Sequence, residues 1–385
     1  MMEGRAIYAP EHEQFRVTVR RFFAEELLPN IDRWEEDGII PRELWRKAGA
    51  AGLLCPTVAP AYGGAGADFL YLCIVDEELG FTGTNSFTIQ THTDIVAAYI
   101  EKLGTEEQKR RFLPGMISGE IIGAVAMTEP GAGSDLKAIR TTAKRDGDHY
   151  VISGAKTYIT NGINADLVIT VVKTAPELGA KGVSLLLVEA DRPGFARGKR
   201  LKKMGMKASD TAELFFDDVR VPASNLLGVE NRGFAQVMGE IPKERLSIAT
   251  IAMAASQKAF DTTVAFARER EVFGQKLGDF QNTQFKLAEL KTQIAVGWAY
   301  LDQCITKHLR GALGTDEAAM AKLFTTELQC RMVDEGLQLH GGWGYMAEAP
   351  IARMYVDARV RRIAGGSSEV MKMLIARSIF PRPKT

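Results

Sequence analysis

The sequence predicts an α+β protein of several domains. An N-terminal α-helical domain and a C-terminal four-helix-bundle domain are expected to flank a central antiparallel β domain. The 385 residues are too many for one simple core. Short β-rich runs are confined to the middle of the chain, and apolar stripes at helical spacing lie on either side of them. We expect the domains at 1–120, 121–237 and 238–385.

The N-terminal part, residues 1–120, is predicted to be helical. Phe15, Val19 and Phe22 recur at the spacing that lines one face of a helix. Leu103 and Gly104 mark a helix end, and Thr105 is a suitable capping residue for the helix that follows.

The central part, residues 121–237, has a different pattern. Four short runs rich in β-branched and aliphatic residues are separated by Gly, Asp, Asn and Pro, at 150–152, 167–172, 183–188 and 213–216. No long helical pattern lies between them. The sequence therefore favours an antiparallel barrel or sandwich over a parallel sheet with crossover helices.

Helices are expected to return from Pro242 onward. Two apolar stripes at helical spacing support this, one of Leu246, Ala249, Met253, Phe260, Val264 and Ala267, and one of Met320, Leu323, Phe324, Leu328 and Met332. Gly341 and Gly342 follow the second stripe as a helix stop. We interpret the stripes as bundle core, extended by oligomerisation.

Composition and charge exclude several functions. The 48 basic and 48 acidic residues balance, which argues against a broad nucleic-acid-binding surface. The four cysteines are scattered, as expected for free thiols in a reducing compartment, and the five histidines show no metal-ligand spacing, so no metal is expected. No apolar run is long enough to span a membrane, and we predict a cytoplasmic protein.

A glycine-rich segment in the centre is the main chemical signal. Gly131 and Gly133 begin like a dinucleotide-binding fingerprint, but Leu136 stands where the third glycine is required, and no strand–helix–strand unit surrounds the segment. A Rossmann interpretation is therefore rejected. The segment instead offers backbone N–H groups and hydroxyls to another kind of ligand.

Together with its neighbours, this segment resembles the acyl-CoA dehydrogenase family. The matching pieces, in order along the chain, are 127–135 MTEPGAGSD, 158–162 YITNG, 268–270 RER, 273–274 FG, 280–281 FQ, 338–345 QLHGGWGY and 365–369 GGSSE. The α, β, α order of the three parts agrees with the resemblance. It implies a flavoprotein that uses FAD to desaturate an acyl-CoA thioester between its α and β carbons.

The resemblance also implies the cofactor contacts. Met127 and Thr128 would contact the isoalloxazine ring, Thr160 would lie near its N5, and Ser134 would serve the pyrophosphate and the pantetheine. The full implied set for FAD is Met127, Thr128, Gly133, Ser134, Tyr158, Thr160, Arg270, Phe273, Phe280, Gln281, Gln338, Gly341, Gly342, Ser367 and Glu369. The family binds each FAD across a subunit boundary in a homotetramer. The residues that would reach a neighbour's cofactor are Arg270, Phe273, Gln281, Gln338, Gly341 and Gly342.

The catalytic base is implied by a departure from the commoner family pattern. Many relatives carry a glutamate where this chain has Gly365, which has no side chain to act as a base. A branch resembling the long-chain and isovaleryl types places the glutamate before an arginine on an earlier helix, here Glu244 before Arg245. We predict Glu244 as the base. The alternative is a charged residue in a first helical turn after Pro242.

Substrate residues follow from the same comparison. The Gly365 N–H would polarise the thioester carbonyl. Arg245 would orient the site or meet CoA, with a structural salt bridge as the alternative. Ser134, Ala364 and Gly366 would also contact substrate, and the small Ala364 leaves room for a branched or wider acyl chain.

Electrons would pass to electron-transferring flavoprotein. The alternatives are an oxidase that uses O₂, a flavoprotein of the same fold without catalysis, and decarboxylation of a dicarboxyl-CoA. The last would need a cation in the acyl pocket, which the sequence does not identify.

Overall fold

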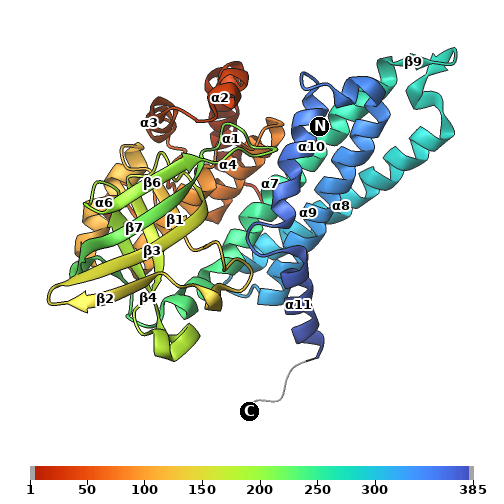
Figure 1. Cartoon of the computed structure of the whole chain (residues 1–385). Helices are drawn as coiled ribbons and strands as arrows, with labels where there is room; N and C mark the ends of the chain where they lie inside the picture. The colour runs from red at the N-terminus through yellow and green to blue at the C-terminus, as the bar shows by residue number, and fades with distance from the viewer. Residues whose placement is uncertain (1–4, 381–385) are drawn as a thin grey trace.

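The computed structural model describes residues 5–380 and contains three parts, with helices at both ends of the chain and a sheet between them (Figure 1). The N-terminal helices are α1 (Pro10–Phe22), α2 (Ile31–Asp37), α3 (Arg42–Ala50), α4 (Phe69–Phe81), α5 (Ala98–Leu103) and α6 (Glu106–Ser118). There are also two π-helical segments: Phe23–Leu27 directly follows α1, and Thr91–Ala97 directly precedes α5.

The predicted helix start at Thr105 is confirmed. Its hydroxyl accepts the Gln108 N–H at 3.2 Å, and the Gln108 side chain accepts the Thr105 N–H at 3.1 Å, which satisfies two otherwise free donors. The preceding helix ends at Leu103, also as predicted.

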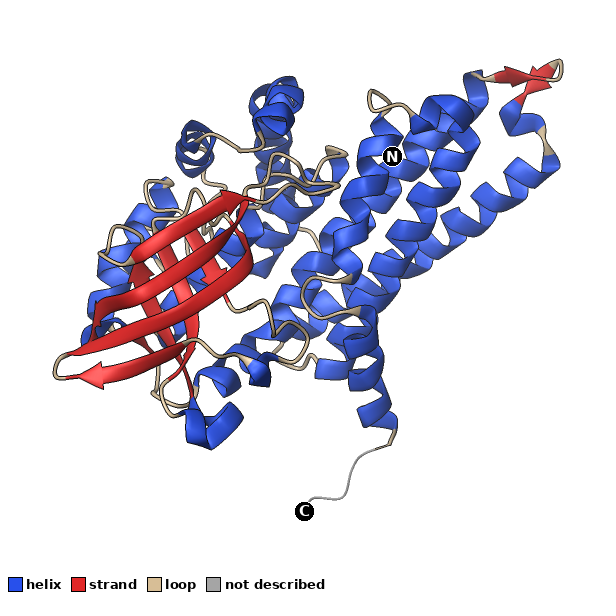
Figure 2. Ribbon diagram, in the orientation of Figure 1, coloured by secondary structure: helices blue, strands red, loops and turns tan. Residues whose placement is uncertain are grey.

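The central part is a sheet of eight strands. They are β1 (Gly123–Ala126), β2 (Thr142–Asp146), β3 (His149–Thr160), β4 (Leu167–Lys173), β5 (Val183–Glu189), β6 (Phe195–Arg200), β7 (Thr211–Pro222) and β8 (Leu226–Leu227). Their order is β6-β7-β3-β2-β4-β5-β8, with β1 beside β4. Figure 2 shows the strands of this sheet gathered at one end of the molecule and the long helices at the other.

The antiparallel prediction holds for most strand pairs but not for β1. That strand pairs parallel with β4 from Gly123↔Leu167 to Ala126↔Thr170, and a single parallel pair joins β2 to β4. Parallel neighbours need a long connection, and here the glycine-rich segment, β2 and β3 lie between β1 and β4. The segment 127–135 is therefore the first part of this connection, between the end of β1 and the start of β2.

The C-terminal part is a helical bundle with a small hairpin at one end. Its elements are α7 (Gly233–Glu269), β9 (Glu271–Val272), β10 (Gln275–Lys276), α8 (Gln281–Leu309), α9 (Thr315–His340), α10 (Pro350–Ala358) and α11 (Ser368–Ile379). The three long helices pack on one another, and both α10 and α11 pack against α9. One core unites Leu246 and Met253 of α7 with Leu290 of α8 and Met332 of α9.

Helix α7 connects the two main cores of the protein. It begins at Gly233, before Pro242, where the sequence suggested that helices resume, and the expected boundary between 237 and 238 falls inside it. Val237 packs in the core shared by the N-terminal helices and the sheet, whereas Leu246 packs in the bundle core. Glu244 therefore lies where the two cores meet, in a helix interior rather than a first turn.

Three further sequence expectations can be compared with residues 5–380. The four cysteines are free thiols. Within this range no group of three or more His, Cys, Asp or Glu is placed to hold a metal ion. No helix there is both long and apolar enough to cross a membrane.

Candidate active site

The carboxylate of Glu244 lies beside a buried tyrosine from another domain. The Tyr99 hydroxyl, on α5, donates a hydrogen bond of 2.5 Å to Glu244 Oε1. Tyr99 is fully buried and Glu244 is partly buried. Burial raises the pKa of Glu244 to about 7, while the Tyr99 hydrogen bond and the charge of Lys243 oppose that rise. A carboxylate with this pKa can accept a proton near neutral pH.

The turn that contains Gly365 lies against the same face of α7. Gly365 has φ +66°, and a Cβ atom placed on it would lie 2.4 Å from Cδ1 of Ile248. Ile248 is one helical turn beyond Glu244, so the two share a face. The structure thus brings Gly365 close to the predicted base, and Ile248 fills the space that a side chain at position 365 would need.

A buried lysine holds this turn in place. Lys322, on α9, is fully buried and donates a hydrogen bond of 2.8 Å from Nζ to the Gly366 carbonyl. Burial, together with the nearby guanidinium of Arg245, lowers the pKa of Lys322 to about 8. The turn at 365–366 is therefore anchored to the bundle through its main chain.

Arg245 is buried but forms no ion pair within residues 5–380. Its Nε has no hydrogen-bond partner there, and burial lowers its pKa against the raising influence of Glu244. The alternative of a structural salt bridge is thus not observed. A buried guanidinium nitrogen without a partner is costly, and it is available to a polar ligand. Ala364 is exposed and Gly366 is half-buried beside this region.

The first group of predicted FAD contacts lies at the ends of β1 and β3. The Thr157 N–H donates to the Thr128 carbonyl at 2.9 Å, which joins the segment after β1 to the end of β3. Tyr158 has φ +59° and is 69% exposed, while Met127, Thr128 and Thr160 are half-buried. Gly133 and Ser134 are exposed, and a Cβ on Gly133 would meet no atom within 4 Å. This open, donor-rich surface fits a flavin nucleotide.

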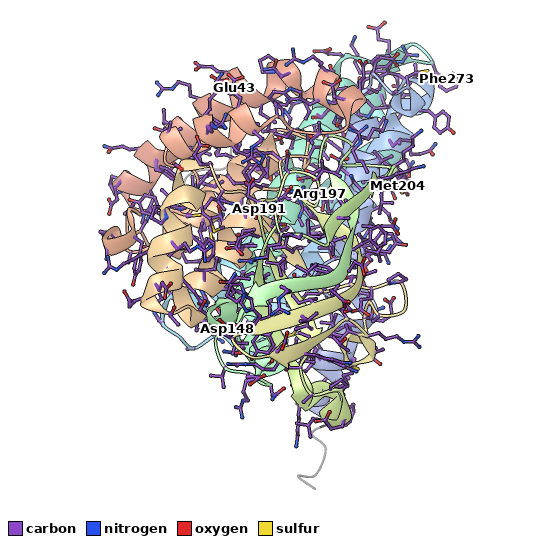
Figure 3. The ribbon with its side chains drawn as sticks, turned by 60° about the vertical axis from the view of Figure 1, so that its left-hand side comes forward. Glu43, Asp148, Asp191, Arg197, Met204 and Phe273 are labelled. Carbon is purple, nitrogen blue, oxygen red and sulfur yellow. The ribbon has the colours of Figure 1, made fainter. Side chains whose placement is uncertain are left out.

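The second group of predicted FAD contacts lies at the far end of the bundle. The end of α7, the start of α8 and the end of α9 meet there, and the Phe266 ring stacks on His340 at a centroid distance of 4.2 Å. Phe273 lies between β9 and β10 and is 98% exposed. Figure 3 labels it at the edge of the molecule. Seven predicted contacts gather at this end: Arg270, Phe273, Phe280, Gln281, Gln338, Gly341 and Gly342.

The two groups are far apart within one chain. Figure 1 shows the sheet, whose strands end at the first group, and the β9–β10 hairpin, which carries Phe273, at opposite ends of the molecule. Along α7, Glu244 and Glu269 are separated by about 38 Å at ~1.5 Å per residue, so the second group is also far from the predicted base.

Ser367 and Glu369 have local structural surroundings. The Ser367 hydroxyl accepts the Val370 N–H at 3.4 Å as the N-cap of α11, and Glu369 is exposed in the first turn of that helix. Their contacts with FAD stay predictions.

A cavity of about 760 Å³ elsewhere in the molecule does not have Glu244 among its lining residues. Its lining includes charged residues, among them Asp191 in the β5–β6 connection and Arg197 in β6, both labelled in Figure 3. Several of these charges are already satisfied, since Arg192 Nε donates to Glu189 at 2.6 Å and Arg197 donates to the Ala165 carbonyl at 2.7 Å. We therefore assign the site by the geometry around Glu244 and not by cavity size.

Sequence reasoning missed Tyr99, Ile248 and Lys322. Lys322 lies on a long helix among residues that form an apolar stripe, and an ammonium in such a position must find a partner if it is buried. Tyr99 offered a similar signal, because a buried tyrosine hydroxyl usually needs a hydrogen-bond partner. Neither signal names the partner.

Comparison with known proteins agrees with the geometry. Family models match the acyl-CoA dehydrogenase N-terminal domain over residues 9–120, the middle domain over 124–219 and the C-terminal domain over 231–380. The mitochondrial long-chain specific acyl-CoA dehydrogenase of Rattus norvegicus is 50% identical over 377 residues, which covers 97% of this chain and 88% of the rat protein.

Two solved structures extend the comparison. The acyl-CoA dehydrogenase of Geobacillus kaustophilus superimposes with a TM-score of 0.96 at 47% identity, covering 98% of this chain and all of that one. A glutaryl-CoA dehydrogenase of Mycobacterium smegmatis, solved in complex with FADH2, has a TM-score of 0.91 at 29% identity and covers 98% of this chain and 96% of its own.

Proposed function

The chain belongs to the acyl-CoA dehydrogenase family of oxidoreductases, and from that premise we propose that it desaturates an acyl-CoA to the trans-2-enoyl-CoA with Glu244 as the base. The observation that carries the proposal is the pairing of Glu244 with Tyr99 on the α7 face that Gly365 approaches. Within this arrangement, Glu244 is the carboxylate whose pKa burial brings near neutrality.

The chemistry of the step follows from that carboxylate. Glu244 would take the proton from the α carbon, and the electron pair of that C–H bond would form the α,β double bond. The Gly365 N–H is proposed to donate to the thioester carbonyl and stabilise the developing negative charge. Arg245 is buried, its Nε has no partner among residues 5–380, and it is proposed to hold a polar part of the substrate.

FAD is the cofactor we propose for the open surface at Met127, Thr128 and Gly133. When bound, it would accept the hydride that leaves the β carbon. The sheet that carries this surface and the hairpin beside Arg270 lie at opposite ends of the molecule in Figure 1, which supports binding between two copies of the chain, each copy supplying one group. A homotetramer with this arrangement would use every predicted contact.

The proposed substrate is an acyl-CoA with a branched or wide chain near its α and β carbons. Ala364 and Gly365 supply little bulk there. The identity with a long-chain specific enzyme supports an extended acyl chain as well. Electron-transferring flavoprotein is the proposed acceptor, and the cytoplasmic location stays a prediction.

The first experiment is an anaerobic absorbance titration of the purified FAD-loaded protein with straight, branched and cyclic acyl-CoAs. Loss of the flavin absorbance with one class of substrate is expected and would identify that class. A yellow protein that none of them bleaches would contradict the proposal and favour a flavoprotein without this activity.

The same preparation distinguishes a dehydrogenase from an oxidase. Turnover is expected with electron-transferring flavoprotein or an artificial acceptor, and little is expected with O₂ alone. Equal turnover with O₂ alone would identify the oxidase alternative.

A further inference from the structure

A buried lysine lies directly beneath the segment proposed to contact the flavin. Lys156, on β3, has no exposed surface. Its Nζ donates to Glu129 Oε1 at 2.8 Å and to the Met127 carbonyl at 3.2 Å. Both acceptors lie in the segment that follows β1. A strand lysine would ordinarily extend into water, so its burial here implies a specific role.

Glu129 is held by further main-chain donors. The Arg140 N–H donates to its Oε2 at 2.5 Å, and the Thr141 N–H donates to its Oε1 at 3.0 Å. Burial alone would raise the pKa of Glu129, but these bonds and Lys156 hold it below its ordinary value. The carboxylate is thus fully bonded and ionised, which an ion pair in a protein interior requires.

Three sets of hydrogen bonds fix the main chain from Met127 to Ala132. Glu129 and Ala132 exchange main-chain hydrogen bonds of 2.9 and 3.0 Å, and the Thr157 N–H holds the Thr128 carbonyl. Lys156 holds the carbonyl before that one, at Met127. The two peptide planes on either side of Thr128 are therefore set by residues of β3.

The contact between Lys156 and Met127 also has an electronic effect. The Met127 carbonyl and the Thr128 N–H belong to one peptide group. An ammonium bound to that oxygen polarises the group and makes its N–H a stronger donor, since hydrogen bonds in a chain reinforce one another. Burial lowers the pKa of Lys156 to about 8 against the influence of Glu129, so the ammonium stays charged at neutral pH.

We propose that Lys156 is a positioning residue for the flavin. Together with Glu129 it orients and polarises the Met127–Thr128 peptide group so that the Thr128 N–H donates to the flavin, and this raises the reduction potential of the flavin. The inference rests on the proposed binding of FAD at this segment. Strong donors directed at a flavin favour its electron-rich reduced form over the oxidised form. The role differs from that of Glu244, because Lys156 acts through the main chain.

The test is the reduction potential of the FAD-loaded protein, measured by anaerobic spectroelectrochemical titration. Lys156→Met is expected to lower the equilibrium constant for two-electron reduction about tenfold, which corresponds to ~30 mV. Lys144→Met is the matched control, because Lys144 is an exposed lysine on the adjacent strand β2. The control should keep the wild-type potential.

A second variant guards against misfolding. Lys156→Met leaves the Glu129 charge buried without its cation, so Lys156→Met/Glu129→Gln removes both charges together and keeps a side-chain oxygen as acceptor. The double variant should bind FAD with the same lowered potential. A folded single or double variant that binds FAD at the wild-type potential would overturn the inference. If the wild-type protein takes up no FAD, the proposed function itself fails, which is a distinct result.

Discussion

The hydroxyl of Tyr99 and the carboxylate of Glu244 are joined by a 2.5 Å hydrogen bond between α5 and α7. The bond crosses from the N-terminal helices to the bundle, so the two domains together fix the orientation of the base. It also stabilises the charged form of Glu244 against burial, which otherwise favours the neutral form. Tyr99 is therefore expected to control the pH at which the base becomes active.

Replacing Tyr99 with phenylalanine should move the pH dependence of flavin reduction upward. A hydrogen bond to a charged group contributes about 1.5–3 kcal/mol, and one pKa unit is about 1.4 kcal/mol, so the inflection should rise by about one to two units. Stopped-flow bleaching by a substrate acyl-CoA across pH 5–10 measures it. Tyr62→Phe, which removes an exposed hydroxyl bonded to Glu106, is the control and should leave the inflection in place.

Replacing Glu244 with glutamine should keep FAD and substrate binding but slow flavin reduction by about 10²–10⁴-fold, the usual contribution of a general base. Single-turnover bleaching under anaerobic conditions measures the rate. Glu107→Gln, an exposed carboxylate of α6, is the control. A Glu244→Gln protein that reduces at the wild-type rate would refute the base assignment.

The same substitution should stabilise the protein in a pH-dependent way. Because folding raises the pKa of Glu244 from 4.5 to about 7, the folded protein binds a proton more tightly than the unfolded chain. Wild-type stability attributable to this group is thus complete below about pH 4.5 and is lost as pH rises through 7. The advantage of Glu244→Gln should grow over that window to about 1–3 kcal/mol and then level off. Urea unfolding at several pH values tests this, and an advantage independent of pH would contradict it.

Moving the base to position 365 should also require a change at one neighbouring residue, Ile248. In a Glu244→Gln background, Gly365→Glu should restore little flavin reduction, because its backbone has φ +66° and its Cβ would displace the Cδ1 end of Ile248. Adding Ile248→Ala removes the obstructing atoms and should recover measurable reduction. Ile248→Ala alone in that background is the control and should recover none. Full recovery by Gly365→Glu without the isoleucine change would disprove the predicted clash.

Arg245 should contribute to substrate affinity. In the Glu244→Gln background, where chemistry is blocked, Arg245→Gln should weaken acyl-CoA binding about tenfold or more, because a charge-assisted hydrogen bond is lost. Equilibrium titration of the flavin spectrum measures the dissociation constant. Arg21→Gln, an exposed arginine of α1, provides the comparison. Unchanged affinity in the Arg245 variant would show that Arg245 does not contact the substrate and would favour a purely structural role.

The three-part architecture could be predicted from the sequence because the spacing of apolar residues along a short stretch of chain distinguishes helices from strands. It placed the start of α7 too late because Pro242 is typical of a first helical turn, yet the helix continues through it. It could not reveal that β1 runs parallel to β4, since a pattern of apolar residues does not specify which strands pair.

Glu244 and Gly365 were predicted through family resemblance, and in the structure the turn of Gly365 packs against the α7 face that carries Glu244. Tyr99 and Lys156 could not be predicted in the same way. Each acquires its role from a partner distant in sequence, Glu244 for the first and Glu129 for the second. From the local sequence alone, Tyr99 would be taken as a core residue of a helix. Lys156 would be taken as a solvent-facing residue of a strand.

The close approach of Ile248 to Gly365 also restricts how this enzyme can change by mutation. A variant that gains a glutamate at 365 while keeping Glu244 would crowd two carboxylates together, and one of them would be forced to hold a proton. A variant that first loses Glu244 has no base at all. Moving the base from position 244 to position 365 by one substitution at a time therefore passes through an impaired protein. Selection for activity would keep the base at position 244.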